Sequence, residues 1–525
     1  MTVPTVFKEC TAVGGFHSLE HDQLGPFVWT EKTFRLQLPR TAPFLLLNVC
    51  YYGDKGILTV HSQGKLLDSV PLCRGWHVCI LRTHFAMPGE ALQMSVEPLI
   101  SVVSDARQLG LMCRRIEVSD DERLCEMTRE SQRNLALNQR EYLAGQILLK
   151  SVPPLIRINL ETRCNIPETS QACVYCAWDW AKAAEQNLPA FSLNTLEQLG
   201  EFYRSAVAVN DCSIGEPTMN KDFGSIVAQL DRDGKQVSFT TNGQLMSPKR
   251  RQEVLGKNLE VYVSIDSTTA EGYARYRNDR FNDLLQNLMA LCNEKKQHQN
   301  LPRIYASFIV MRSNVVELRS FFALMRRVGV DEIKLRMLYL DENVIDVSVN
   351  NGYRFDYAAE LLSAEELSPV GPLARELSDE HQIRVYVESE RFPVDAHSQG
   401  APLCSEPWRT LYVLRRGIMP CCYATEPIAR WDEQQGRPLD EFLQDVFNGP
   451  AYQELRSELA AGRLASSCLN TPSCPILRQK LELGLIDAPL NVFQRQVVAK
   501  PACASAAFLP MVPLETLTRR VQSAA

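Results

Sequence analysis

The sequence predicts an α/β fold: a partial (β/α)6 barrel between an N-terminal all-β sandwich and a small C-terminal domain that carries cysteines. Three observations lead to this prediction. Short β-prone runs recur about every ten residues before residue 118. Strand-like and helix-like segments then alternate six times, and clustered cysteines return after residue 401. The chain has 525 residues, which at about 150 residues per domain is enough for about three domains.

The composition excludes several classes of protein. Lys and Arg number 56 against 62 Asp and Glu, so the net charge of −6 does not favour a nucleic-acid partner. No apolar run approaches the ~18 residues that cross a bilayer, and no signal-like stretch opens the chain, so we expect a cytoplasmic protein without a membrane span. Seventeen cysteines without an export signal favour metal or redox chemistry over disulfides.

The N-terminal region is predicted to be all-β. Residues 1–118 place runs such as FLLLNVCYY, GILTVHS and ALQMSVEPLI between Gly and Pro turns, the pattern of an antiparallel sandwich. Residues 119–150 become charged and lose β-branched residues, which predicts a helical linker.

The central region, residues 151–345, changes to the rhythm of a parallel sheet. Apolar runs such as LIRINL, QVSFTTN, LEVYVSID and RIYASFIVM alternate with amphipathic segments, and six such units predict a closed or partly closed barrel. Residues 346–400 are polar and are taken as a connecting segment. Residues 401–482 form a compact cysteine-bearing domain, and residues 483–525 form a tail to which no structure is assigned.

Three cysteines follow the first predicted barrel strand. Cys164 is separated by eight residues from Cys173, and Cys176 lies three positions further on. Thiolates so closely spaced bind zinc or an iron-sulfur cluster, but a structural zinc site needs a fourth ligand and none is adjacent. Three cysteines leave one iron of a 4Fe-4S cluster open to bind a small molecule. The spacing therefore favours a 4Fe-4S cluster.

Polar turns follow the next three strands, where reactive groups of a parallel barrel gather. Each turn alone is a weak signal, but their order and placement predict one shared mouth opposite the cysteine loop. The residues of these turns are Gly215, Glu216 and Pro217, then Thr241, Asn242 and Gly243, then Ser264, Ile265 and Asp266.

With these motifs, residues 155 to about 340 resemble the core of the radical SAM superfamily. The resemblance implies that the three cysteines hold a 4Fe-4S cluster and that its open iron chelates S-adenosylmethionine, which is cleaved to methionine and a 5′-deoxyadenosyl radical. It also places Tyr175 near adenine, the backbone of Gly215, Glu216 and Pro217 at the amino group, and Ser264 and Asp266 on the ribose side. The first gap between cysteines is longer than is usual in the family, and Ile214 replaces the usual first Gly.

A second group of cysteines lies in the C-terminal domain. Four thiolates brought together would enclose a cluster or a zinc ion completely. The pattern resembles a SPASM or shorter twitch extension, which implies one auxiliary 4Fe-4S cluster; zinc remains an alternative. Cys421 is either a ligand in place of its neighbour, a packing residue or a hydrogen-atom donor to a substrate radical. The predicted ligands are Cys404, Cys422, Cys468 and Cys474.

The expected function is hydrogen abstraction from a carbon of an organic substrate, with oxidation, epimerisation or elimination as the outcome. A weak likeness of the N-terminal module to one attached to bacterial glycosyltransferases, and Trp29, which could stack on a sugar ring, favour a carbohydrate or glycosylated substrate. Alternatives are a peptide-modifying enzyme and a non-catalytic iron-sulfur protein that binds glycans. A flavodoxin or ferredoxin would supply electrons.

Overall fold

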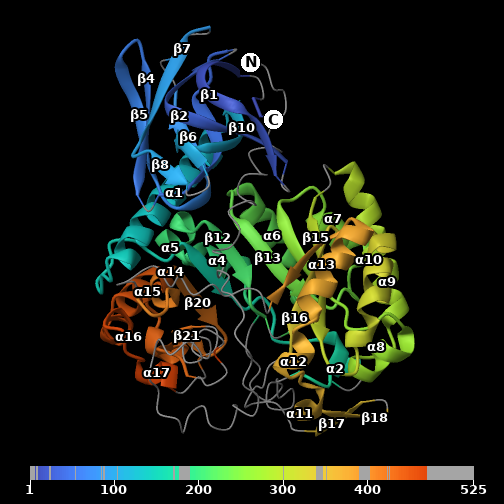
Figure 1. The fold of residues 1–525 in the computed structure, drawn as a ribbon. Helices are drawn as coiled ribbons and strands as arrows, with labels where there is room; N and C mark the ends of the chain where they lie inside the picture. Colours follow the sequence, from blue (N-terminus) through green and yellow to red (C-terminus); the bar gives the residue numbers. More distant parts are fainter. Residues whose placement is uncertain are drawn as a thin grey trace.

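Two large β-sheets organise the chain in the computed structural model, one formed before residue 120 and the other after residue 150 (Figure 1). Among the described residues, no helix is both long and apolar enough to cross a bilayer. The structure describes residues 6–7, 10–22, 25–38, 40–53, 55–83, 86, 89–102, 105–169, 172–176, 190–213, 215–298, 301–338, 347–350, 352–388, 402–421, 424, 426–469 and 474.

The N-terminal sheet is antiparallel and has the order β5-β4-β7-β2-β10-β3-β6, with β1 paired to β2. The two halves of β2 have different neighbours, because Val28 and Trp29 pair with β10 whereas residues 33–37 pair with β7. The predicted all-β character is confirmed; the two layers of a sandwich stay a prediction. The strands are β1 (Thr11–Asp22), β2 (Gly25–Gln37), β3 (Phe44–Tyr51), β4 (Gly56–Ser62), β5 (Lys65–Leu72), β6 (Gly75–Arg82), β7 (Ala91–Glu97), β8 (Ile100–Val102), β9 (Asp105–Leu109) and β10 (Met112–Ser119).

The predicted helical segment is one long helix, α1 (Glu122–Leu143), which lies between the two sheets (Figure 1). It begins at Asp121, whose side chain accepts from the backbone N–H of Leu124 at 2.9 Å. On one side, buried Arg129 pairs with Asp68 of β5. On the other side, the Asn138 Nδ2 donates to the backbone carbonyl of Trp408 at 2.7 Å. The helix therefore joins the N-terminal sheet to the rest of the protein through buried contacts.

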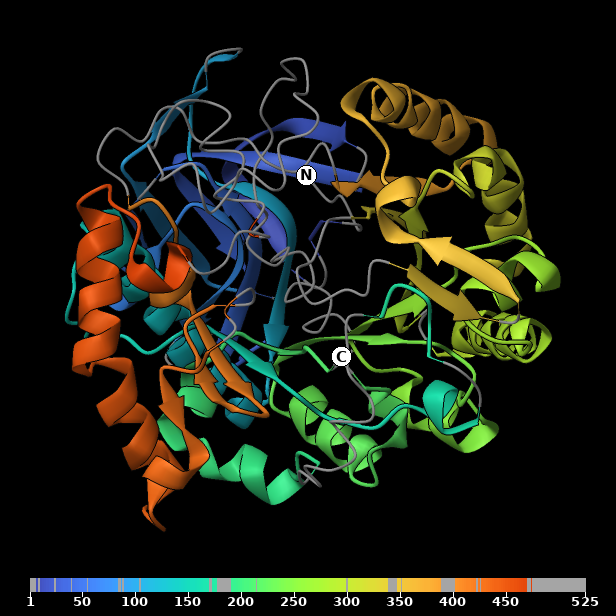
Figure 2. The ribbon, with the colours of Figure 1, turned by 90° about the horizontal axis from the view of Figure 1, so that it is seen from below.

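The second sheet contains all six predicted barrel strands in parallel and in chain order, and it curves with helices on its outer side (Figure 2). Two further parallel strands, β19 (Arg384–Val387) and β20 (Thr410–Leu414), extend its two edges. The sequence did not predict that either would join the barrel. The six strands are β11 (Leu155–Ile158), β12 (Ala208–Asp211), β13 (Gln236–Thr241), β14 (Leu259–Ser264), β15 (Arg303–Val310) and β16 (Glu332–Met337).

The helices of this region follow the strands and bury the apolar side of the sheet. Residues of one parity along the strands, such as Ile156, Val261 and Leu335, pack into the main hydrophobic core. Residues of the other parity, such as Arg157 and Tyr262, therefore face the inside of the barrel. The elements are α2 (Asn165–Thr169), α4 (Leu193–Gln198), α5 (Gly200–Ser205), η1 (Pro217–Met219), α6 (Phe223–Arg232), α7 (Pro248–Val254), α8 (Ala270–Tyr276), α9 (Phe281–Glu294), η2 (Lys295–Gln297), η3 (Val315–Glu317), α10 (Leu318–Val328), β17 (Val347–Asn350), β18 (Tyr353–Asp356), α11 (Tyr357–Glu360), α12 (Ala364–Leu367) and α13 (Val370–His381).

The C-terminal region packs against α1 and the edge of the barrel (Figure 1). Strands β20 and β21 form a hairpin in which Leu414 pairs with Gly417 at the turn. Further on, Pro450 occupies the first turn of a helix, where proline is well tolerated. The elements are α14 (Glu406–Arg409), β21 (Gly417–Met419), β22 (Ala429–Arg430), η5 (Trp431–Gln434), α15 (Leu439–Phe447), α16 (Pro450–Ala460) and α17 (Ser466–Leu469).

Candidate active site

The three predicted cluster cysteines lie together beyond the carboxyl end of β11. Cys173 and Cys176 form one turn, closed by a 2.9 Å bond from the Cys176 N–H to the Cys173 carbonyl. Burial raises the pKa of Cys164 to about 12, and the nearby thiolate charges of Cys173 and Cys176 raise it further. Burial likewise raises the pKa of Cys173 to about 11, although the positive charge of Arg277 opposes that rise. Iron must therefore displace thiol protons when it binds.

The donor set suits a cluster better than a single ion. Within the described ranges, no three Cys, His, Asp or Glu side chains converge closely enough to hold one metal ion. A cubane does not require such convergence, because each cysteine binds a different iron. Three partly exposed cysteines within electrostatic range of one another therefore fit a 4Fe-4S cluster.

The cysteine loop is docked on the neighbouring turn of α8. The Val174 N–H donates to the carbonyl of Tyr276 at 3.0 Å, and the Val174 side chain packs in a small apolar cluster with Tyr276 and Phe355. The Tyr175 hydroxyl donates to Asp266, just beyond β14. Backbone, apolar and hydroxyl contacts thus fix the two residues between the cysteines.

The Asp266 carboxylate anchors the cysteine loop through hydrogen bonds. Its side chain is 1% exposed, and its Oδ2 accepts from Tyr175 and from the Arg277 Nε at 2.7 Å. Its Oδ1 accepts from the Ile309 N–H at 2.8 Å. Protein donors thus contact both oxygens, and the ribose contact predicted for Asp266 stays a prediction. Ser264 is partly exposed at the end of β14, and its ribose role stays a prediction.

The turn after β12 lies against the backbone that leads to Cys164. The Glu216 N–H donates to the Arg163 carbonyl at 2.8 Å. A Cβ atom at Gly215 would lie 2.4 Å from that carbonyl oxygen and 2.6 Å from that of Glu161, so only glycine fits here. Gly215 and Glu216 thus lie directly beside the backbone that leads into the cysteine loop. Ile214 lies outside the described residues.

Glu216 links this turn to the one after β13. Its carboxylate accepts from the Thr241 hydroxyl at 2.6 Å and from the Asn242 N–H at 2.8 Å. Burial raises the pKa of Glu216. Asn242 in turn directs its Nδ2 toward the Cys164 sulfur at 3.9 Å. All three predicted turns therefore meet the cysteine loop, the third through the bond from Tyr175 to Asp266. Because the Glu216 side chain is engaged internally, a ligand contact at this turn falls to its backbone.

The inside of the barrel is polar and aromatic. The rings of Tyr262 and Tyr305 stack at 4.5 Å, and both hydroxyls donate to Glu260. The Lys334 ammonium lies 4.5 Å from the centre of the Tyr262 ring. Near the opposite edge, Arg157 directs its Nη1 toward the Cys212 sulfur at 3.5 Å. Such a lining can hold a substrate with charged and aromatic groups.

The C-terminal cysteines also come together, although they start from separate elements. Burial raises the pKa of Cys404 well above the usual range, and the charges of Glu406, Cys474 and Cys421 raise it further. Burial also raises the pKa of Cys468, again with a contribution from Cys474. Four cysteines therefore share one buried neighbourhood beside α14, as a closed site requires.

Cys422 lies outside the described residues, so the choice between it and Cys421 as ligand stays a prediction. The predicted hydrogen donation by Cys421 stays a prediction as well. The placement of Cys421 near Cys404 favours its role as a ligand or neighbour of the auxiliary group.

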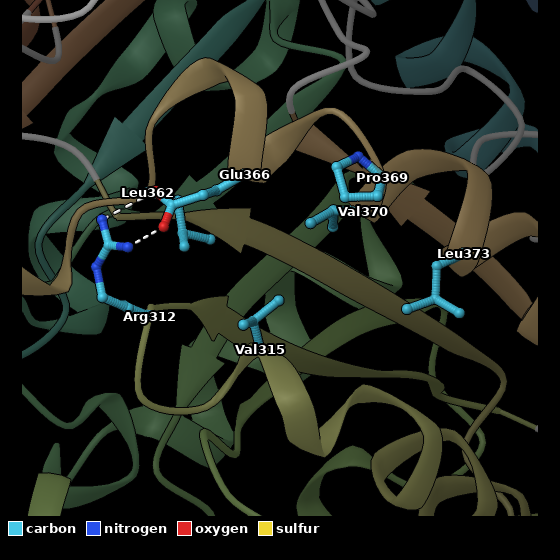
Figure 3. A pocket seen from close by; sticks show the side chains of 7 residues that line it. All are labelled: Arg312, Val315, Leu362, Glu366, Pro369, Val370 and Leu373. Atoms are coloured by element: carbon cyan, nitrogen blue, oxygen red, sulfur yellow. Dashed lines mark hydrogen bonds and ion pairs between the residues drawn. The ribbon is translucent and has the colours of Figure 1, made fainter.

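One groove lies apart from these residues, between η3 and helices α12 and α13 (Figure 3). Its polar end is an ion pair in which the Arg312 Nη2 donates to Glu366 at 2.9 Å. None of the candidate site residues lines it. The lining residues are Arg312, Val315, Leu362, Glu366, Pro369, Val370 and Leu373.

Sequence reasoning missed Arg277, which lies just after α8 and contacts both Asp266 and the Cys173 side chain. It belongs to no motif, and a lone arginine near a helix end usually faces solvent. Its burial depends on contacts with residues far apart in the sequence, so no local signal indicates it.

No model of a known protein family matches the chain. Among curated proteins, the mycofactocin maturase MftC of Mycobacterium tuberculosis (strain CDC 1551 / Oshkosh) is 26% identical over 182 residues, 34% of this chain and 43% of the relative. MftC of Mycolicibacterium smegmatis is 25% identical over 178 residues, again 34% and 43%. The chain thus spans less than half the length of these relatives.

Two solved structures align with much of the chain at low identity. Streptococcus suis SuiB bound to its precursor peptide SuiA has a TM-score of 0.45 and 14% identity, covering 75% of this chain and 82% of SuiB. The enzyme anSMEcpe, with bound AdoMet and the Cp18Cys peptide, has a TM-score of 0.42 and 12% identity, covering 71% and 97%.

The expected carbohydrate substrate gains no support from these relatives or from the N-terminal sheet. Trp29 is only 7% exposed and packs against Phe27 and Tyr52, so it belongs to the core and offers no face to a sugar. The match to the maturases covers a third of the chain and agrees with the cysteine motif at the barrel mouth. Both observations support the predicted resemblance to the radical SAM superfamily, with 4Fe-4S clusters and S-adenosylmethionine as cofactors.

Proposed function

We propose that this protein is a radical SAM enzyme that modifies a peptide substrate by abstracting hydrogen from one of its carbons. The observation that carries the proposal is the cysteine loop, fixed beside the turns at residues 215–217 and 241–243 at the mouth of a parallel barrel. The peptide as substrate is supported by the match to MftC, since a maturase converts a precursor into its mature form.

In this proposal Cys164, Cys173 and Cys176 hold the cluster that binds S-adenosylmethionine. When bound, this cluster supplies the electron that cleaves S-adenosylmethionine and starts hydrogen abstraction. The backbone at Gly215 and Pro217 receives the amino end of the cofactor. The backbone of Glu216 belongs to the same turn, and its side chain keeps the two turns together through its bonds to Thr241 and Asn242.

The second cysteine group would hold one auxiliary cluster through Cys404, Cys468, Cys474 and either Cys421 or Cys422. This group and the inside of the barrel are joined by protein contacts. The Tyr412 hydroxyl donates to Glu406 at 2.6 Å, and the Arg157 guanidinium lies 5.9 Å from the centre of the Tyr412 ring. A substrate bound inside the barrel beside Arg157 would thus lie between the two cysteine groups. A flavodoxin or ferredoxin would supply electrons from outside.

The test is anaerobic reconstitution with iron and sulfide, followed by S-adenosylmethionine and dithionite. We expect 5′-deoxyadenosine by mass spectrometry, and none from a variant with Cys164, Cys173 and Cys176 all changed to Ala. A full cluster that neither binds nor cleaves S-adenosylmethionine would contradict the proposal and favour a non-catalytic iron-sulfur protein.

The substrate class is tested by the same assay under limiting conditions. Ribosomal precursor peptides are compared with oligosaccharides at equal concentration, each with the intact enzyme and with Arg157→Ala. We expect a peptide to raise the yield of 5′-deoxyadenosine. The peptide should either lose mass or, when it carries deuterium, transfer deuterium to 5′-deoxyadenosine. Stimulation by oligosaccharides alone would restore the carbohydrate hypothesis.

A further inference from the structure

We propose that Arg277 is a positioning residue for the cluster that binds S-adenosylmethionine, and that its charge beside the Cys173 thiolate raises the reduction potential of that cluster. The inference rests on the proposed function, because it requires the cluster on Cys164, Cys173 and Cys176. It adds a residue outside the cysteine motif to the machinery that controls electron entry.

The guanidinium of Arg277 is held rigidly and is almost fully buried. Its side chain is 9% exposed, and both Nε and one terminal nitrogen lie 2.7 Å from the Asp266 Oδ2. The other terminal nitrogen, Nη1, is 4.0 Å from the Cys173 sulfur. The Arg277 carbonyl accepts from the Asn350 Nδ2 at 2.7 Å. Side chain and backbone are therefore both fixed, with one N–H group directed at the cysteine.

Asp266 sets the direction of this N–H group. The carboxylate is itself held by the Ile309 N–H and the Tyr175 hydroxyl, and the Asp266 backbone carbonyl accepts from Asn314 at 3.0 Å. Such a carboxylate cannot turn without breaking its bonds to Ile309 of β15, to Tyr175 and to Arg277. The pair Asp266–Arg277 is thus a fixed support that presents positive charge to one thiolate.

Charge arithmetic gives the direction of the effect. Reduction adds one electron to the cluster, so a buried cation stabilises the reduced form more than the oxidised form. Hydrogen bonds to cluster sulfurs act in the same direction. Because Arg277 lies in a low-dielectric setting, screening by water is weak. Loss of this charge should make the cluster harder to reduce.

This role differs from holding the loop in place. The loop is independently anchored by the Val174 N–H bond to Tyr276 and by the packing of Val174. Removal of the Arg277 charge therefore leaves backbone and apolar contacts that keep Cys173 and Cys176 in place.

The test compares Arg277→Gln, Arg277→Lys and a matched control in redox titrations followed by electron paramagnetic resonance. The control is Arg303→Gln. Arg303 is a buried arginine paired with Glu332 at 2.8 Å, but it starts β15 and so lies at the opposite end of the barrel. The signal that changes when S-adenosylmethionine is added identifies the cluster with the open iron.

At a fixed solution potential, we expect the ratio of reduced to oxidised cluster to fall about tenfold in Arg277→Gln, which is a shift of about 59 mV for one electron. Arg277→Lys should keep most of the wild-type ratio, and Arg303→Gln should leave it unchanged. Iron content per chain should stay at the wild-type value.

An unshifted potential in Arg277→Gln would overturn the inference while leaving the proposed function intact. Equal shifts in the Arg277→Gln and Arg303→Gln variants would also overturn it, because the effect would then be general. If Arg277→Gln takes up no iron, the Lys variant decides, and its failure to assemble a cluster would reduce Arg277 to a loop anchor. Absence of the cluster from the wild-type protein would instead contradict the proposed function.

Discussion

The two cysteine groups are assembled in different ways. At the barrel mouth, the three cysteines come from one loop, and Arg277 places positive charge beside Cys173. In the C-terminal domain, the cysteines come from segments around α14, β21 and α17, and Glu406 places negative charge near Cys404. The first group combines one segment of the chain with the polar turns that contact it. The second is gathered by packing and has the character of a closed site.

This difference predicts a division of labour. A group beside a cation and polar turns suits a cluster that must accept an electron and bind a cofactor. A group buried beside a carboxylate suits a cluster whose ligands are all protein atoms. Mutations in the first group should therefore stop the cleavage of S-adenosylmethionine, whereas mutations in the second group should stop only the conversion of the substrate.

The largest expected effect is that of Cys173→Ala. It should abolish 5′-deoxyadenosine formation and remove about four of about eight irons per chain, because one thiolate of the open cluster is lost. The N-terminal sheet, which shares no strand with the barrel, should keep its circular dichroism. Mass spectrometry and iron analysis measure the result. Retained cleavage would break the assignment of the first group.

Cys404→Ala should differ from Cys173→Ala in which of the two reactions it loses. We expect slow cleavage of S-adenosylmethionine without substrate to persist, while conversion of a peptide substrate is lost. Metal analysis should show about four irons fewer per chain; a loss of about one zinc with unchanged iron would identify a zinc site instead. If Cys404→Ala and Cys173→Ala behave alike, the two groups are not independent.

The six barrel strands could be predicted from the sequence because each strand shows a local pattern of apolar residues. Each of the six strands has apolar residues of one parity that pack against helices, such as Val261 and Val263 in β14. The sequence did not place the edge strand β20 in the barrel, because its pairing with β11 joins Leu155 to Thr410, which are far apart in the sequence. β19 has only four residues in a polar region, too few to show a period.

The candidate site was predictable where chemistry follows a motif and not where it depends on packing. The cysteines and the turn at Gly215 lie where the spacing placed them. The bonds of the Asp266 carboxylate to Tyr175 and Arg277 join residues that are distant in the sequence, so only the assembled fold determines them. Trp29 misled the substrate prediction because a core tryptophan and a sugar-binding one have the same local sequence signal.

A third prediction tests whether packing gathers the C-terminal cysteines. Arg456 in α16 is fully buried; its Nε donates to the Pro407 carbonyl at 3.0 Å and its Nη1 to the Ile147 carbonyl at 3.0 Å. Arg456→Met should leave these buried carbonyls without donors and cost about 3 kcal/mol of stability. Thermal unfolding and the iron content of the auxiliary group measure this.

The exposed Arg463, paired with Glu458, provides the matched control, and Arg463→Met should change stability by less than about 0.5 kcal/mol. Equal effects of the two substitutions would show that the buried contacts of Arg456 do not hold this domain. Loss of iron from the barrel cluster alone would also contradict the prediction.

The smallest expected effect concerns pH and belongs to the barrel side alone. Burial raises the pKa of Asp211, at the end of β12, to about 7. The folded state binds this proton more tightly than the unfolded chain does. The free energy of unfolding therefore rises as the pH falls below about 7, until the pH reaches the ordinary pKa of an aspartate. Between pH 8 and pH 6 the gain is about 1 kcal/mol. Asp211→Asn keeps the acceptor for the Leu160 N–H but cannot titrate, so the difference in melting temperature between wild type and variant should depend on pH. A difference that stays constant from pH 8 to pH 6 would mean that Asp211 remains ionised in the folded barrel.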